Sequence, residues 1–140
     1  SHPVDRFLAI ADPRARAIAT LRVQDRRFAV LPRAEAAARV EARMAQETRF
    51  MGHASNASGY LRLLAARAGH DCAERLDRIG QPTLVLTGRH DDQSPLALSH
   101  TLAHGLPRGT LSEHDAGHGL LFTDPTAVAA VLPFLKEHAP

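Results

Sequence analysis

The sequence predicts an α/β protein in which a helical region precedes a strand–helix–strand–helix unit. Three observations support this fold class. The composition changes near residue 80, from a stretch rich in Ala, Arg and Leu to one with short β-prone runs. Apolar residues recur at helical spacing before that point, and strand and helix patterns alternate after it. The 140 residues, 44% of them hydrophobic, suffice for one modest domain with a core.

Residues 1–80 are predicted to form a helical layer. Asp12-Pro13 is typical of a helix start, with an N-cap followed by proline, and this helix should run to about Arg26. A second helix should begin at Leu31-Pro32 and end before Gly52. We expect a polar loop at residues 53–58, a third helix that ends before Gly69, and a short fourth helix over residues 71–79.

Residues 81–140 are predicted to form two parallel strands, each followed by a helix. The apolar run 82–88, bounded by proline and glycine, indicates a strand covered on both faces, and residues 110–113 indicate a weaker one. A helix should join them over residues 94–106. Residues 120–122 should return the chain to the core before a last helix opened by Asp124-Pro125. That helix carries one apolar stripe, Val128, Val131, Leu132 and Leu135.

Two parallel strands alone do not make a stable sheet, because parallel sheets persist as several strands buried on both faces. The sequence therefore predicts that further strands come from another chain or from a larger fold of which this is the C-terminal part.

Composition narrows the function classes. The net charge of +2 divides unevenly: residues 1–80 hold 14 Arg and 9 acidic residues, whereas residues 81–140 hold 3 basic and 6 acidic ones. The arginines alternate with acids at helical spacing and only 4% of residues are aromatic, which favours a solvated helix face over a nucleic-acid site. Cys72 is alone, so neither an internal disulfide nor a thiolate zinc site is expected. No signal peptide or membrane span is visible, and a cytoplasmic location is expected.

The candidate site comes from the two loops that follow the predicted strands. One loop is "GRHDDQSP" (88–95) and the other is "HDAGHG" (114–119). Because functional groups gather at the carboxyl ends of parallel strands, an acid from the first loop and a histidine from the second should meet. Such a pairing orients an imidazole and stabilises its charged form, as a general base requires.

The motifs "PTLVLTGRHDDQSP" and "GHGLLFTDP" resemble the C-terminal end of an α/β-hydrolase. In that family a strand ends in Gly-x-x-Asp-x-x-x-Pro, which gives the triad acid, and a later Gly-His loop gives the base. The resemblance implies that Asp91, between Gly88 and Pro95, is the acid and that His118 is the base. It is specific over about residues 59–135. It further implies that residues 1–80 are a helical cap or lid, and that residues 81–140 belong to the hydrolase core.

The family's nucleophile lies on a Gly-x-Ser-x-Gly elbow, and no such motif occurs in these 140 residues. Ser55 and Ser58 lack a preceding apolar strand, and neither has glycines two places to either side. We therefore expect the nucleophile, Ser or Asp, on an N-terminal half supplied by a separate chain or missing segment, so that this chain is inactive alone. The expected activity is serine-type hydrolysis of a small ester, lactone or related carbonyl substrate. No metal or organic cofactor, nucleic acid or membrane partner is implied.

Several alternatives stay open from the sequence alone. Asp92 adjoins Asp91 and could be the acid instead, and His90 and His114 are less favoured candidates for the base. His100 and His104 stand four apart on a predicted helix and could bind a metal together with His114 and His118. Ser1 could act as an N-terminal nucleophile. The alternative function is a non-catalytic binding or scaffold module derived from a hydrolase fold.

Overall fold

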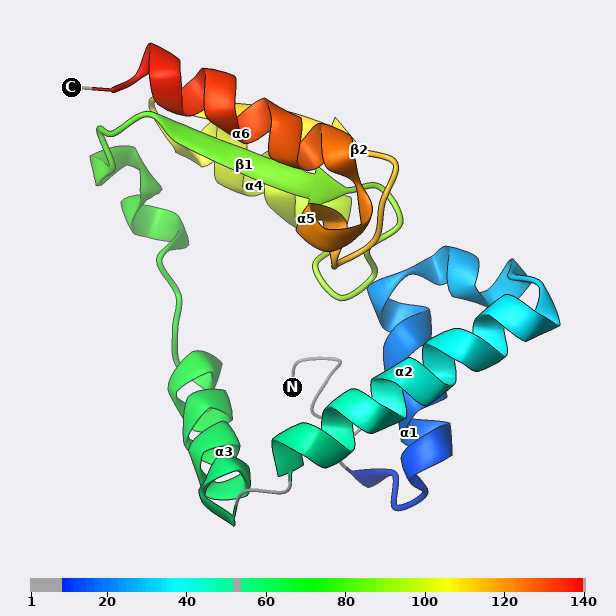
Figure 1. The fold of residues 1–140 in the computed structure, drawn as a ribbon. Helices are drawn as coiled ribbons and strands as arrows, with labels where there is room; N and C mark the ends of the chain where they lie inside the picture. The colour runs from blue at the N-terminus through cyan, green and yellow to red at the C-terminus, as the bar shows by residue number, and fades with distance from the viewer. Residues whose placement is uncertain (1–8, 52–53, 140) are drawn as a thin grey trace. The chain divides into compact units, whose positions relative to one another are not determined.

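The chain divides into two compact units in a computed structural model that describes residues 9–51 and 54–139. The first unit contains the described residues of 1–23 and 27–70, and the second contains those of 24–26 and 71–140. The fold is mixed α/β, mostly helical, with a two-stranded parallel sheet (Figure 1). The predicted α/β class is thus confirmed at this level, and the α/β-hydrolase fold remains a prediction. Ser1 lies outside the described residues.

Helices make up the first unit. Their bounds are α1 (Pro13–Gln24), the 3-10 helix η2 (Arg26–Val30), α2 (Arg33–Met51) and α3 (Ala54–Ala68). The Asp12 carboxylate accepts hydrogen bonds from the backbone N–H groups of Arg14 and Ala15, at 3.1 and 3.3 Å, so it caps α1 as predicted. The expected loop over residues 53–58 was wrong, because α3 already begins at Ala54. The side chains of Ser55 and Ser58 lie outside the described part.

A small apolar core and ion pairs hold the first unit together. Ala17, Phe28 and Val40 are buried against one another. Glu47 accepts hydrogen bonds from both Arg16 and Arg43, at 3.1 and 3.0 Å. The arginines of the helical region therefore pair in part with acids of the same unit.

The second unit is a parallel two-stranded sheet with helices on both faces. It comprises the 3-10 helix η3 (Ala73–Arg78), β1 (Thr83–Gly88), α4 (Leu96–Gly105), β2 (Gly109–His114), α5 (Leu120–Thr123) and α6 (Pro125–Glu137). The register pairs Thr83 with Gly109 at one end and Gly88 with His114 at the other. Figure 1 shows α4 behind the strands and α6 in front of them. Both strands and their connecting helix follow the prediction closely.

The core of this unit lies under α4. Leu76 of η3, Val85 of β1, Ala103 of α4 and Leu106 form one buried cluster. Because the ladder pairs the two strands over their whole length, the loops that follow Gly88 and His114 start from defined positions.

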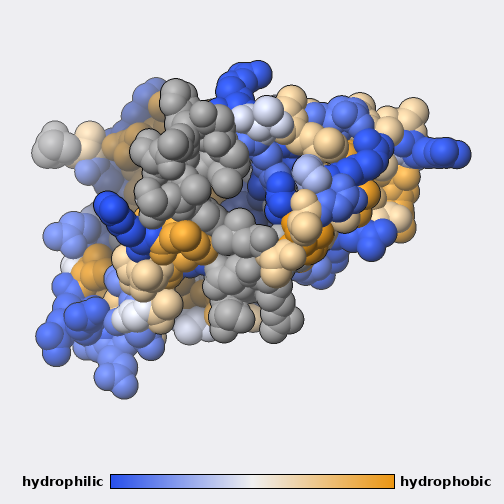
Figure 2. All heavy atoms as spheres, turned by 90° about the horizontal axis from the view of Figure 1, so that it is seen from below, coloured by the Kyte–Doolittle hydropathy of each residue, from blue (hydrophilic) through white to orange (hydrophobic). Residues whose placement is uncertain are grey.

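The apolar face near the C-terminus differs from the prediction. Leu132 and Leu135 of the apolar stripe are 60% and 57% exposed, and Phe122 is 95% exposed on α5, a helix that the sequence did not predict. Residues 120–122 therefore do not return the chain to the core. A sheet of two strands is too narrow to cover these side chains. Viewed from below, the surface shows apolar patches among hydrophilic residues (Figure 2).

No helix within residues 9–51 and 54–139 is both long and apolar enough to cross a membrane.

Candidate active site

The two loops at the carboxyl ends of the strands are joined by the backbone. Beyond the sheet, the N–H of Arg89 donates to the His114 carbonyl at 2.9 Å, and the N–H of His90 donates to the Ala116 carbonyl at 3.0 Å. A Cβ at Gly88 would lie 2.3 Å from the Ala116 carbonyl oxygen, well inside contact distance. Glycine at position 88 therefore allows the second loop to lie directly against the end of β1.

This junction brings Asp91 and His118 together, as the sequence predicts. Nδ1 of His118 lies 2.8 Å from Oδ2 of Asp91. The Asp91 side chain is 6% exposed and that of His118 is 36% exposed. A buried carboxylate thus faces an imidazole that is partly exposed. The catalytic roles of the two residues stay a prediction.

The second oxygen of Asp91 is held by its own loop. Oδ1 accepts hydrogen bonds from the backbone N–H groups of Gln93 at 2.8 Å and Ser94 at 2.9 Å. An Asp that bonds the backbone two residues ahead in this way is an Asx turn. Because both oxygens are engaged, the carboxylate plane is fixed relative to the imidazole, and the charge of the buried group is compensated.

The Gln93 side chain contacts the other ring nitrogen. Its Nε2 lies 2.9 Å from Nε2 of His118. The sequence did not predict this contact. The only signal would have been the position of Gln93 itself, two residues after the acid and within the same turn.

A distant stretch of chain, the 24–26 segment, also supports both loops. The Gln24 carbonyl accepts a hydrogen bond of 2.7 Å from the His118 N–H, and the Arg26 N–H donates to the His90 carbonyl at 3.0 Å. The Arg26 guanidinium further donates to the Arg89 carbonyl. A Cβ at Gly117 would lie 2.3 Å from the Gln24 carbonyl oxygen, so glycine is needed there for close approach. Its φ is not positive, and the turn therefore does not depend on a left-handed conformation.

The rival acid and one rival base have other partners. Asp92 is half-exposed and lies 3.6 Å from the Arg26 guanidinium. Nε2 of His90 is 2.6 Å from a carboxylate oxygen of Asp115. Asp91, by contrast, is the acid whose carboxylate bonds to His118.

His114 is buried at the end of β2, where its two ring nitrogens meet polar partners. Nε2 lies 2.9 Å from the Ser112 hydroxyl, and Nδ1 lies 3.0 Å from the Thr126 hydroxyl and 3.4 Å from Asp124. Asp124 is the N-cap of α6, and hydrogen bonds from the Thr126 hydroxyl and then the Thr126 N–H lower its pKa, with His114 adding to this effect. These contacts describe a structural histidine that ties β2 to α6.

The histidines that the sequence left open as metal ligands do not form a metal site. No group of three or more His, Cys, Asp or Glu side chains is arranged to hold a metal ion in the described ranges. The rings of His100 and His104 stack with centroids 6.1 Å apart, and His100 reaches Glu113 at 2.9 Å.

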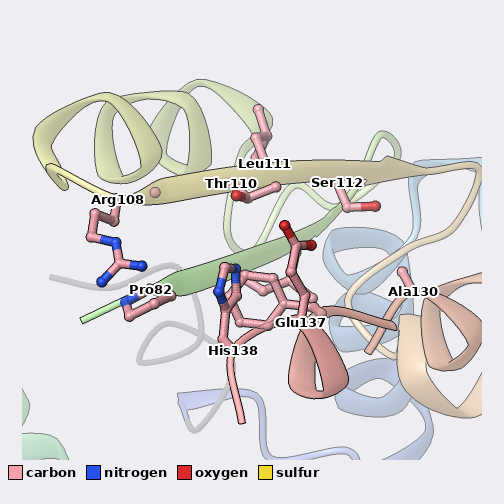
Figure 3. Close-up of a pocket in the computed structure, with 11 residues that line it drawn as sticks. Pro82, Arg108, Thr110, Leu111, Ser112, Ala130, Glu137 and His138 are labelled. Atoms are coloured by element: carbon pink, nitrogen blue, oxygen red, sulfur yellow. The ribbon is translucent and has the colours of Figure 1, made fainter. Parts of the chain in front are cut away.

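A surface cavity of about 490 Å³ lies away from the Asp91–His118 pair. It is lined by Pro82 and Arg108 before the strands, and by Glu137 and His138 at the end of α6 (Figure 3). It therefore adjoins the amino ends of the strands, whereas Asp91 and His118 follow the carboxyl ends.

The arrangement can perform proton transfer. Since an ionised carboxylate only accepts hydrogen bonds, Nδ1 of His118 carries the proton shared with Asp91. Nε2 of the neutral ring then holds a lone pair that can take a proton from a hydroxyl within reach.

Comparison with known proteins gives one partial match. The chain is 39% identical over 80 residues to the poly(3-hydroxyalkanoate) depolymerase of Ectopseudomonas oleovorans, a match that covers 56% of this chain and 28% of that protein. No family model matches the chain, and no solved structure matches it. The chain is therefore similar, over part of its length, to a hydrolase of ester bonds.

Proposed function

We propose that this chain is the acid-and-base portion of a serine-type α/β-hydrolase that cleaves carboxylic esters. The observation that carries the proposal is the 2.8 Å hydrogen bond between Asp91 and His118, on loops joined at the carboxyl ends of two parallel strands. The partial similarity to a poly(3-hydroxyalkanoate) depolymerase supports an ester as the bond cleaved. A 3-hydroxyacyl ester is accordingly the first substrate class to test.

In this mechanism His118 takes the proton from a nucleophilic hydroxyl as that oxygen attacks the ester carbonyl. Asp91 holds the Nδ1–H tautomer and stabilises the imidazolium that forms. His118 then returns the proton to the leaving alcohol, and water completes the cycle by the same route. No metal or organic cofactor is required by these steps.

The nucleophile is proposed to come from an N-terminal half that adds strands beside β1. Two features support such a partner: the sheet has two strands in the part of the chain that the structure describes, and apolar side chains on α5 and α6 are exposed. The helices of residues 1–80 would form the lid over the substrate.

The proposal is tested in a protein that joins this chain to its nucleophile-bearing half. Asp91→Asn should lower kcat by roughly four orders of magnitude, as loss of the acid does in serine proteases, and His118→Ala should be at least as damaging. Asp92→Asn is the matched control, since Asp92 faces Arg26 at 3.6 Å and not the imidazole. Full ester hydrolysis by Asp91→Asn would rule out the proposed roles.

A fluorophosphonate probe, which labels activated serines, separates catalysis from the alternative. A label on the joined or co-purifying half, lost in His118→Ala, supports a hydrolase. A folded assembly that stays unlabelled and inactive indicates a non-catalytic binding or scaffold module.

A further inference from the structure

The amide of Gln93 lies against the nitrogen of His118 that would act as the base. Gln93 Nε2 and His118 Nε2 are 2.9 Å apart, while the opposite ring nitrogen is 2.8 Å from Asp91. Because Asp91 fixes the proton on Nδ1, the neutral ring presents a lone pair at Nε2. The Gln93 NH₂ group is therefore the donor and the imidazole the acceptor.

One carboxylate organises this entire contact. Asp91 holds the imidazole through Oδ2, and through Oδ1 it binds the backbone N–H of Gln93 at 2.8 Å. The Gln93 side chain then reaches from that anchored backbone to the far nitrogen of the same ring. Three hydrogen bonds thus link Asp91, His118 and Gln93 in a closed ring.

The contact also has a cost. Oε1 of Gln93 is buried and has no hydrogen-bond partner in the described part of the chain. A buried carbonyl oxygen without a donor is unfavourable. A competing hydroxyl could therefore displace the amide from Nε2, and the Gln93 side chain would lose no other hydrogen bond.

We propose that Gln93 is a positioning residue for His118. While the nucleophile is not bound to Nε2, the Gln93 amide donates a hydrogen bond to that nitrogen and so keeps the ring in the Nδ1–H tautomer. When the nucleophilic hydroxyl binds Nε2, it replaces the amide. The catalytic meaning of this contact rests on the proposed function. The contact itself is a property of this chain and can be tested without the nucleophile.

Acylation of histidine by diethyl pyrocarbonate measures how free the Nε2 lone pair is. In Gln93→Leu, which keeps the side-chain bulk and removes the donor, His118 should react about five-fold faster, the factor that corresponds to one ordinary hydrogen bond. Peptide mass spectrometry follows His118, with the exposed His70 as the internal reference. The rate at His70 should not change.

A second variant separates hydrogen bonding from shielding. Gln93→Ala removes both the donor and the bulk, so it should react at least as fast as Gln93→Leu. Acceleration in Gln93→Ala with no change in Gln93→Leu would mean that the side chain only shields the ring, and it would overturn the proposal. Unchanged rates in both folded variants would do the same.

The unmodified chain provides a readout that does not depend on any Gln93 variant folding. The imidazole ¹H–¹⁵N spectrum of the neutral ring, assigned by the signals lost in His118→Ala, should show a proton on Nδ1 and a hydrogen-bonded acceptor at Nε2. A proton on Nε2, or an Nε2 resonance typical of a free lone pair, contradicts the proposal. If these results hold while Asp91→Asn leaves hydrolysis intact, the contact stands and the proposed hydrolase mechanism fails.

Discussion

Gly117→Ala should displace His118, the candidate base, without changing any ionisable group. The added Cβ would lie 2.3 Å from the Gln24 carbonyl oxygen and 2.7 Å from the Asp25 side chain. Gly117 has no positive φ, so alanine adopts its backbone conformation and the contact alone causes the effect.

The size of the effect follows from the displacement. Non-bonded heavy atoms pack at about 3.5 Å, so the loop must move by roughly 1 Å relative to Gln24. Gln24 accepts the N–H of the next residue, His118, at 2.7 Å, and that hydrogen bond moves with the loop. A misplacement of this size near a reacting group costs roughly 10²-fold in rate. We expect kcat/KM to fall by about that factor.

The assay compares ester hydrolysis by Gly117→Ala and Gly119→Ala in the protein joined to its nucleophile-bearing half. Gly119 flanks His118 on the other side, and a Cβ there meets nothing within 4 Å. Its variant should keep nearly full activity. Equal activities of the two variants, both with unchanged thermal unfolding, would refute the argument that Gln24 positions the base.

Two predictions concern stability. The lowered pKa of Asp124 means that its carboxylate stabilises the fold fully above the ordinary Asp pKa of 3.8 and loses this effect as the pH falls through the lowered value. In Asp124→Asn, which keeps an N-cap acceptor but not the charge, the melting temperature should depend less on pH in that acidic window; identical pH profiles would contradict this. Leu76→Ala should lower the free energy of unfolding in denaturant by roughly 2–5 kcal/mol, because Leu76 is 7% exposed in the core cluster. Leu98→Ala, at a side chain 63% exposed, should have little effect, and similar losses in both would show that the cluster is not the core.

The sheet and the Asp91–His118 contact could be predicted because their signals are local. Gly88 ends a bounded apolar run, the parallel register sets the direction of both loops, and side chains that leave the same sheet edge meet. The family's spacing already favoured Asp91 over its neighbour Asp92, and in three dimensions Asp92 lies near Arg26 whereas Asp91 bonds to His118.

Other features depend on contacts that no short pattern encodes. The Gln93 contact depends on a side-chain conformation within a turn, and the Gln24 carbonyl comes from a part of the chain where the sequence shows only a helix end. Helical periodicity identified the apolar stripe on α6, but it does not show what covers such a face.

The 24–26 segment has a consequence for how the site forms during folding. The sheet pairs residues 83–88 with residues 109–114 after closing a short loop, whereas the His118 N–H must find the Gln24 carbonyl across most of the chain. Contacts of such high sequence separation require a larger entropic cost of loop closure. The sheet can therefore form early with its acid in place, while the loop that carries the histidine reaches its final conformation only when the 24–26 segment has bound to it. A fragment of residues 71–140 would retain the strands and lose the acceptor for the His118 N–H.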